Sequence, residues 1–279
     1  NLILDAFVRW NFYKNMELWV GQTKLPGNRE RVISSQKLQF VDRSLVNSRF
    51  NIDRDMGIQF RNKISFGSIL TRQALAISQG EGRNRTNKKD PNPENGFEYT
   101  ARIEVLPLGE FTGKGDYFSS DLKREETPKI SFGLTYDLNR SAARVGGNLG
   151  SYIEDANDFV IDSALADLNT ILADVMFKYK GFSLLSEYAS KNMDGDRISN
   201  EDGDIINNYY TGNGLNIQAG YLLNNNLEPS IRFTTISPEL SSERDLQEML
   251  TFGLSRYIRG HSLKIQTDFS IIITETDQI

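Results

Sequence analysis

Apolar and polar residues alternate with a period of two along most of the chain, which predicts β-strands rather than helices. Over residues 130–138, one face of such a strand carries Ile, Phe, Leu, Tyr and Leu, and the other carries Ser, Gly, Thr and Asp. Segments 97–105, 215–223 and 263–273 repeat this pattern. We count about twelve such runs, each close to the ~10 residues that a tilted membrane strand needs. The predicted strands begin near Leu2, Met16, Arg54, Ile64, Gly96, Lys129, Leu165, Gly181, Gly214, Asn226, Glu248 and His261.

The connections between these runs alternate in length. Tight turns are predicted at 13–15, 61–63, 178–181, 223–226 and 258–260, and long polar loops at 79–95, 139–164, 191–212 and 237–247. Short turns at one end and long loops at the other are typical of bacterial outer-membrane barrels, whereas a β-sandwich has no reason to segregate them. Segment 106–128 fits neither class, and we expect a short helix or an irregular turn there. The sequence therefore predicts an all-β fold, an antiparallel transmembrane β-barrel forming a single domain over residues 1–279.

Composition removes several alternatives. The chain has no Cys and one His, which excludes disulfide scaffolds, Cys-ligated zinc, Cys nucleophiles and multi-His metal sites. No apolar run reaches the roughly 18 residues of a membrane-spanning helix. The mean hydropathy of −0.45 suggests a soluble protein, but a transmembrane barrel gives the same average because its lipid-facing and lumen-facing residues alternate.

Little in the sequence points to catalysis. The acidic loop 194–204 offers oxygen ligands for Ca²⁺ but lacks the order of an EF-hand, so we interpret it as an external loop. His261 lies at a predicted turn without a nucleophile motif or an obvious carboxylate to orient it. We therefore expect no enzyme activity, no metal and no cofactor. Nucleic-acid binding is also not expected, because the chain is acidic and its basic residues concentrate in one loop.

One basic stretch departs from the acidic average. Residues 24–63 hold nine Lys or Arg and four Asp or Glu, whereas the rest of the chain carries a net charge of −10. If the loop folds into a barrel, its cations would form a positive constriction that replaces part of the hydration shell of an anion. If the loop lies on the surface, the same charges are solvated or bind lipopolysaccharide phosphates. The candidate constriction and anion-binding residues are Lys24, Arg29, Arg31, Lys37, Arg43, Arg49 and Arg54.

The same stretch carries a family resemblance. Residues 16–60 contain, in order, Val20-Gly21-Gln22, Lys24-Leu25-Pro26, Arg29 and Arg31, Ser34-Ser35, Phe40-Val41-Asp42-Arg43-Ser44 and Arg54-Asp55-Met56-Gly57-Ile58. In this it resembles the phosphate-selective porin O and P family, in a form similar to Bacteroidetes-type outer-membrane porins. The resemblance implies a sixteen-stranded trimeric barrel in a Gram-negative outer membrane, with a long loop narrowing the pore and passive, anion-preferring diffusion. Since about twelve strands are visible, strands are expected to be missing before Asn1 and after Ile279.

Alternation also assigns residues to the lumen of such a barrel. Five of the lumen-facing candidates are basic: Arg9, Arg102, Lys178, Arg232 and Lys264. Seven are acidic: Asp5, Glu98, Glu104, Asp137, Asp174, Glu187 and Asp268. This mixed lining leaves the preference between anions and cations open.

The leading functional hypothesis is an outer-membrane porin for small hydrophilic solutes, including anions such as phosphate. Its expected partners are outer-membrane lipid, lipopolysaccharide, the solutes themselves and two further copies in a homotrimer. The main alternative is a closed structural barrel, a subunit of an outer-membrane assembly or secretion complex. A barrel enzyme and a soluble β-sandwich binding module are weaker alternatives.

Overall fold

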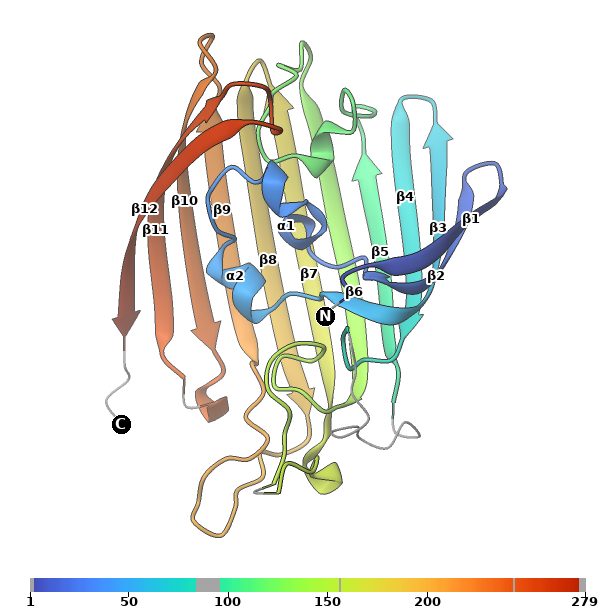
Figure 1. The fold of residues 1–279 in the computed structure, drawn as a ribbon, viewed down its shortest axis with the longest axis vertical. Helices are drawn as coiled ribbons and strands as arrows, with labels where there is room; N and C mark the ends of the chain where they lie inside the picture. Colours follow the sequence, from blue (N-terminus) through green and yellow to red (C-terminus); the bar gives the residue numbers. More distant parts are fainter. Residues whose placement is uncertain (1–2, 84–95, 156, 243, 276–279) are drawn as a thin grey trace.

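The protein is a single antiparallel sheet of twelve strands in chain order, β1 to β12, in a computed structural model that describes residues 3–83, 96–155, 157–242 and 244–275 (Figure 1). This confirms the predicted all-β antiparallel fold. The strands are β1 Ala6–Tyr13, β2 Met16–Lys24, β3 Arg54–Phe66, β4 Ile69–Ser78, β5 Glu98–Leu106, β6 Lys129–Ala142, β7 Ala166–Tyr179, β8 Phe182–Asp194, β9 Gly212–Tyr221, β10 Leu227–Pro238, β11 Leu246–Tyr257 and β12 Lys264–Glu275. The helices are short: α1 Arg29–Val32, α2 Leu45–Arg49, and the 3-10 turns η1 Ser35–Lys37, η2 Gly115–Tyr117, η3 Asp162–Ala164 and η4 Leu240–Ser242.

The two faces of the sheet differ as the alternation predicts. On the outer face, large apolar side chains are open, with Leu134 52% and Ile231 46% exposed. On the inner face, small polar side chains such as Thr135 and Thr251 are fully buried. An apolar exterior around a polar interior is the arrangement of a transmembrane barrel wall.

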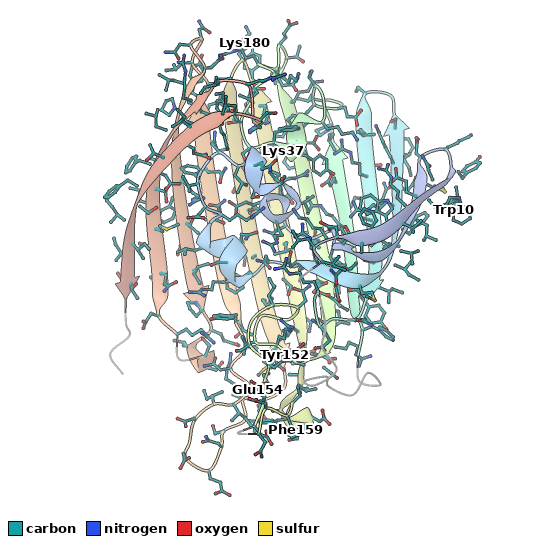
Figure 2. All side chains as sticks on the ribbon, in the orientation of Figure 1. Trp10, Lys37, Tyr152, Glu154, Phe159 and Lys180 are labelled. Carbon is teal, nitrogen blue, oxygen red and sulfur yellow. The ribbon has the colours of Figure 1, made fainter. Side chains whose placement is uncertain are left out.

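The connections segregate by length (Figure 1). The short links 14–15, 67–68, 180–181, 222–226 and 258–263 lie at one end of the sheet. The described parts of the long links between β4 and β5, β6 and β7, β8 and β9, and β10 and β11 lie at the other. In Figure 2, Lys180 marks the short-turn end, whereas Glu154 and Phe159 lie in a loop at the long-loop end. The segment 107–128 belongs to the short-turn end despite its length, and it contains η2.

One predicted hairpin is wrong. The tight turn expected at 61–63, and the strand expected to begin near Ile64, fall inside β3, which continues to Phe66. The turn is made by Gly67 and Ser68, and Gly67 has φ +60°, a left-handed conformation that glycine adopts without steric cost. Three consecutive polar residues at 61–63 resemble a loop, but the inner face of this sheet accepts charged side chains in mid-strand.

The described strands form an open sheet. β1 pairs with β2 alone and β12 pairs with β11 alone within the described residues, so these strands do not close a cylinder. None of the helices in the described ranges has both the length and the apolar character that a membrane crossing requires.

Two connections lie against the inner face. Residues 25–53, which we call the inner loop, carry α1, η1 and α2 in front of the sheet (Figure 1), and Figure 2 places Lys37 there. Contacts of the inner loop reach from Glu104 on β5 to Asp268 on β12. Residues 107–128, the inner turn segment, approach from the short-turn end, where the buried amine of Lys178 on β7 binds three of their carbonyl groups. The two segments therefore cover much of the inner face.

Candidate functional site

The inner loop is held first by apolar packing. Leu25, Val46, Phe50 and Ile52 form a buried cluster with small and aliphatic side chains of the wall, Ala76, Leu172, Ala189 and Ile236. A second cluster joins Ile33 and Leu38 of the loop to Phe111 of the inner turn segment and to Leu70, Leu106, Met176 and Leu185 of the wall. Strands β7 and β8 are thus apolar at several inward positions, because these positions face protein and not water.

Local capping shapes the loop itself. Ser44 is the N-cap of α2, and its hydroxyl accepts a hydrogen bond from the Asn47 N–H at 3.2 Å. The same hydroxyl donates to the carboxylate of Glu30 at 2.6 Å, which also accepts from the Ser44 N–H. The Glu30 N–H donates in turn to Glu187 on β8 at 2.7 Å. These bonds fix α1 against α2 and both against the wall.

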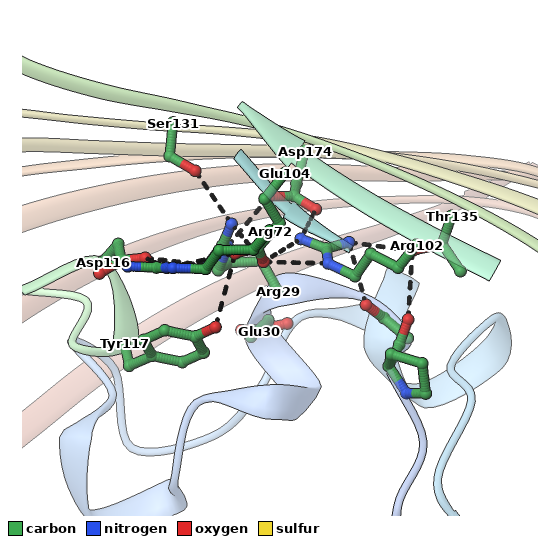
Figure 3. Close-up of polar contacts among 12 residues, drawn as sticks. Arg29, Glu30, Arg72, Arg102, Glu104, Asp116, Tyr117, Ser131, Thr135 and Asp174 are labelled. Atoms are coloured by element: carbon green, nitrogen blue, oxygen red, sulfur yellow. Dashed lines mark hydrogen bonds and ion pairs between the residues drawn. The ribbon is translucent and has the colours of Figure 1, made fainter. Parts of the chain in front are cut away.

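Arg29 is the centre of a buried ionic network (Figure 3). Its side chain is 0% exposed and reaches Glu104 at 2.8 Å, Asp174 at 3.0 Å and Asp116 at 3.5 Å. It also donates to Ser131 at 3.1 Å. The carboxylates come from β5, β7 and the inner turn segment, so this guanidinium joins three parts of the chain to the inner loop.

Two wall arginines complete the network. Arg102 on β5 donates to Asp174 at 2.6 Å and to Glu104 at 3.0 Å, and it binds the Gly27 carbonyl of the inner loop at 3.1 Å. Arg72 on β4 pairs with Asp116 and with Glu104. Three guanidiniums thereby balance three carboxylates, and the result is a neutral cluster in the protein interior rather than a row of free cations.

The other predicted constriction residues have varied surroundings. Arg31 pairs with Asp53, and Arg54 pairs with Asp5 at 3.1 Å. Lys24 donates to the carbonyl groups of Arg31 and Val32. Arg43 donates to the carbonyl groups of Glu30 and Ile33, and burial together with the neighbouring Arg31 lowers its pKa. Lys37 lies over the Phe118 ring at 4.0 Å and Arg49 over the Tyr210 ring at 5.1 Å.

The five basic residues assigned to the lumen also bind neighbouring groups. Arg9 pairs with Glu17 on β2, and Arg102 belongs to the network described above. Lys178 donates to the carbonyl groups of Gly115, Phe118 and Ser120 at 2.7–2.8 Å. Arg232 donates to the Asp42 carbonyl at 2.8 Å, and Lys264 to the Leu38 carbonyl at 2.6 Å. Four of the five therefore hold the inner loop or the inner turn segment in place.

A cavity of about 650 Å³ remains between strands β1–β5, the inner loop and Tyr117, and we call it the main cavity. Among the described residues, its charged lining contains eight cations and four acids. The cations are Arg9, Lys24, Arg54, Arg61, Lys63, Arg72, Arg102 and Lys114, and the acids are Asp5, Glu17, Glu104 and Glu110. Each of these acids already has an ion-pair partner.

Three lining cations, Lys24, Arg61 and Lys114, make no ion pair among the described residues. Arg61 lies over the indole of Trp19 at 4.2 Å and donates to the Gln59 side chain. Its donors are thus partly used by a neutral acceptor, and its charge is not balanced by a carboxylate among the described residues. Along the described lining of the main cavity, positive charge therefore exceeds negative charge.

Sequence reasoning missed several of these residues. The basic stretch includes Arg61 and Lys63, but the sequence pattern places them in a turn, and it does not single out Arg72. Lys114 and Tyr117 lie in the one connection whose structure the pattern left open. The signal for Arg61 is its spacing from Gln59. In a strand that continues past residue 61, these two residues lie on the same, inward face.

Comparison with known proteins agrees with this architecture. The family model described as phosphate-selective porin O and P matches residues 1–228. An uncharacterized protein of Aquifex aeolicus (strain VF5) is 25% identical over 282 aligned positions, which cover 93% of this chain. The chain spans 60% of the length of that relative.

Proposed function

Because the chain belongs to the phosphate-selective porin O and P family, we propose that it forms an outer-membrane porin through which small hydrophilic anions diffuse passively beside the inner loop. The charge of the main cavity carries this proposal. Its four described acids are all paired, whereas Lys24, Arg61 and Lys114 have no ion-pair partner among the described residues. Rings of Arg and Lys are a known device of anion pores. Phosphate is one candidate solute.

The chemistry requires no covalent step. An anion entering the cavity loses part of its hydration shell, and guanidinium and ammonium donors replace the lost hydrogen bonds. The acids keep the net charge moderate, so that an anion is attracted but also leaves. The neutral Arg29 network has a different role in this proposal, because it fixes the position of the inner loop and thereby the width of the passage.

The proposal is tested by ion selectivity in planar bilayers. We expect the triple variant Lys24→Gln, Arg61→Gln, Lys114→Gln to lower the anion-over-cation permeability ratio, read from the reversal potential in a KCl gradient. The control is Arg140→Gln, since Arg140 is exposed and pairs with Asp167 outside the cavity. An unchanged reversal potential in the triple variant would refute the role of the cavity.

A closed structural barrel is the second candidate. The inner loop and the inner turn segment both cover the inner face, which favours a plugged interior for a subunit of an outer-membrane assembly or secretion complex. Purified protein that inserts into bilayers and never conducts would support this candidate.

The surroundings of the barrel belong to the same proposal. The exposed apolar face would contact outer-membrane lipid and lipopolysaccharide, and the family resemblance implies a homotrimer. Chemical crosslinking in native membranes tests the oligomer, and a monomeric pattern would contradict it.

A further inference from the structure

A second cavity, of about 280 Å³, lies at the long-loop end, and we call it the mouth cavity. It is bounded by the end of α2, residues 210–211, the end of β10 and residues 244–247. None of its lining residues lines the main cavity. It is therefore a separate space, on the side of the protein where the long loops lie.

Two arginines and one tyrosine give this cavity its chemistry. The guanidinium carbon of Arg244 lies 3.9 Å from the centre of the Tyr210 ring, and that of Arg49 lies 5.1 Å from it. Arg244 donates to the Asn208 carbonyl at 3.0 Å, and its Nε is buried without a hydrogen-bond partner. Contact with the aromatic ring holds both guanidiniums in place without neutralising their charge.

Within the described ranges, neither arginine is neutralised by a carboxylate. Among the described residues, no ion pair within 4.0 Å involves Arg49 or Arg244, although Asp245 also lines the cavity. The described lining therefore has two cations and one acid, an excess of positive charge. A planar guanidinium with free donors is the side chain best suited to bind a phosphate group.

Part of the remaining wall is apolar, and Thr211 and Gln247 add polar groups to it. Phe50 and Ile236 line the cavity and belong to the apolar cluster that anchors the inner loop, and Pro238 lies beside them. Since water occupies about 30 Å³ per molecule in the liquid, the cavity is larger than a bare tetrahedral anion needs. Its shape and chemistry suit an anionic head attached to a carbon skeleton.

We propose that the mouth cavity binds small organic phosphates. Arg49 and Arg244 hold the phosphate group, and the organic group packs against Phe50, Ile236 and Pro238. Such a site would concentrate phosphate monoesters at the long-loop entrance. It does not depend on ion conduction, so this inference and the proposed function can fail separately.

The experiment is calorimetric titration of the full-length protein in detergent with phenyl phosphate, inorganic phosphate and phenol. We expect phenyl phosphate to bind at least ten-fold more tightly than inorganic phosphate or phenol. The double variant Arg49→Gln, Arg244→Gln is expected to lose at least ten-fold in affinity, and Arg140→Gln to bind as the wild type does. The single variants Arg49→Gln and Arg244→Gln, each expected to weaken binding, serve if the double variant does not fold.

Variants of the main cavity separate the two proposals. Lys24→Gln with Arg61→Gln is expected to alter ion selectivity and to leave the affinity for phenyl phosphate unchanged. No binding by the wild type, equal affinity for inorganic phosphate, or wild-type affinity in the folded arginine variants would each overturn the inference.

Discussion

Replacing Arg29 by Met should destabilise the protein through the inner loop. Arg29 is fully buried and balances Glu104, Asp116 and Asp174 together with Arg72 and Arg102. Without it, three carboxylates face two guanidiniums in the interior. Removing one partner of a buried ion pair costs about 3–5 kcal/mol, and we expect a loss of that size in the free energy of unfolding.

The measurement is urea unfolding in phospholipid vesicles, combined with trypsin digestion of the folded protein. The Arg29→Met variant should unfold at lower urea and be cut faster within the inner loop, at Arg31 or Lys37. Arg29→Lys keeps the charge but loses the planar guanidinium that reaches several carboxylates. Its urea midpoint and its rate of tryptic cleavage should lie between those of Arg29→Met and the wild type.

The matched control is Arg140→Met. The side chain of Arg140 is 58% exposed and pairs with Asp167, and exposed ion pairs contribute only about 0–1 kcal/mol. If Arg29→Met unfolded at the urea concentration of the wild type, with the inner loop equally protected, the reasoning that this network anchors the loop would be refuted.

Three further predictions concern other parts of the molecule. Burial and the nearby Lys264 and Lys178 lower the pKa of His261 to about 4 from 6.5. The contribution of neutral His261 to stability is therefore complete above pH 6.5 and is lost as the pH falls toward 4, and after allowance for solvent screening we expect the free energy of unfolding to fall by about 1–2 kcal/mol. A His261→Phe variant whose urea midpoint keeps the wild-type pH dependence would contradict this. Lys178→Met leaves three carbonyl groups of the inner turn segment without their donor and should lower the free energy of unfolding by about 3 kcal/mol. The loosened segment should be cut faster by trypsin after Lys114, and unchanged cleavage would count against this prediction. Leu134→Arg places a charge on the outer face, and its urea midpoint in vesicles should fall by the equivalent of about 2–4 kcal/mol if that face lies in hydrocarbon; equal midpoints would argue that it does not.

The alternating pattern predicted the strands well because one face of each strand is exposed and apolar along most of its length. It failed at Arg61, Asn62 and Lys63, where charged inward residues flank a polar residue and resemble a turn. Alternation reports which face a residue occupies but not what covers that face. The inward Leu172 and Met176 depart from the polar lining expected of a lumen because they pack against the inner loop.

The candidate site was less predictable than the fold. The sequence identified a basic loop, but it could not show that Arg29 is neutralised by carboxylates 75 to 145 residues away. The bonds of Lys178 are to carbonyl groups, which leave no trace in the residue pattern. The unpaired cations of the main cavity include Arg61 and Lys114, one hidden by the misplaced turn and the other in a segment without a regular pattern.

The position of the inner loop has a consequence for biogenesis. The loop follows the second strand in the chain, yet the Arg29 side chain binds Asp174, 145 residues later, and the Val41 N–H binds Asp268, 227 residues later. Contacts between such distant residues form slowly, because a long segment must be ordered before they can be made. The wall can grow hairpin by hairpin, but the contact of the inner loop with Asp268 cannot form before β12 is in place. A nascent barrel would thus pass through a stage with a wide, unfilled interior.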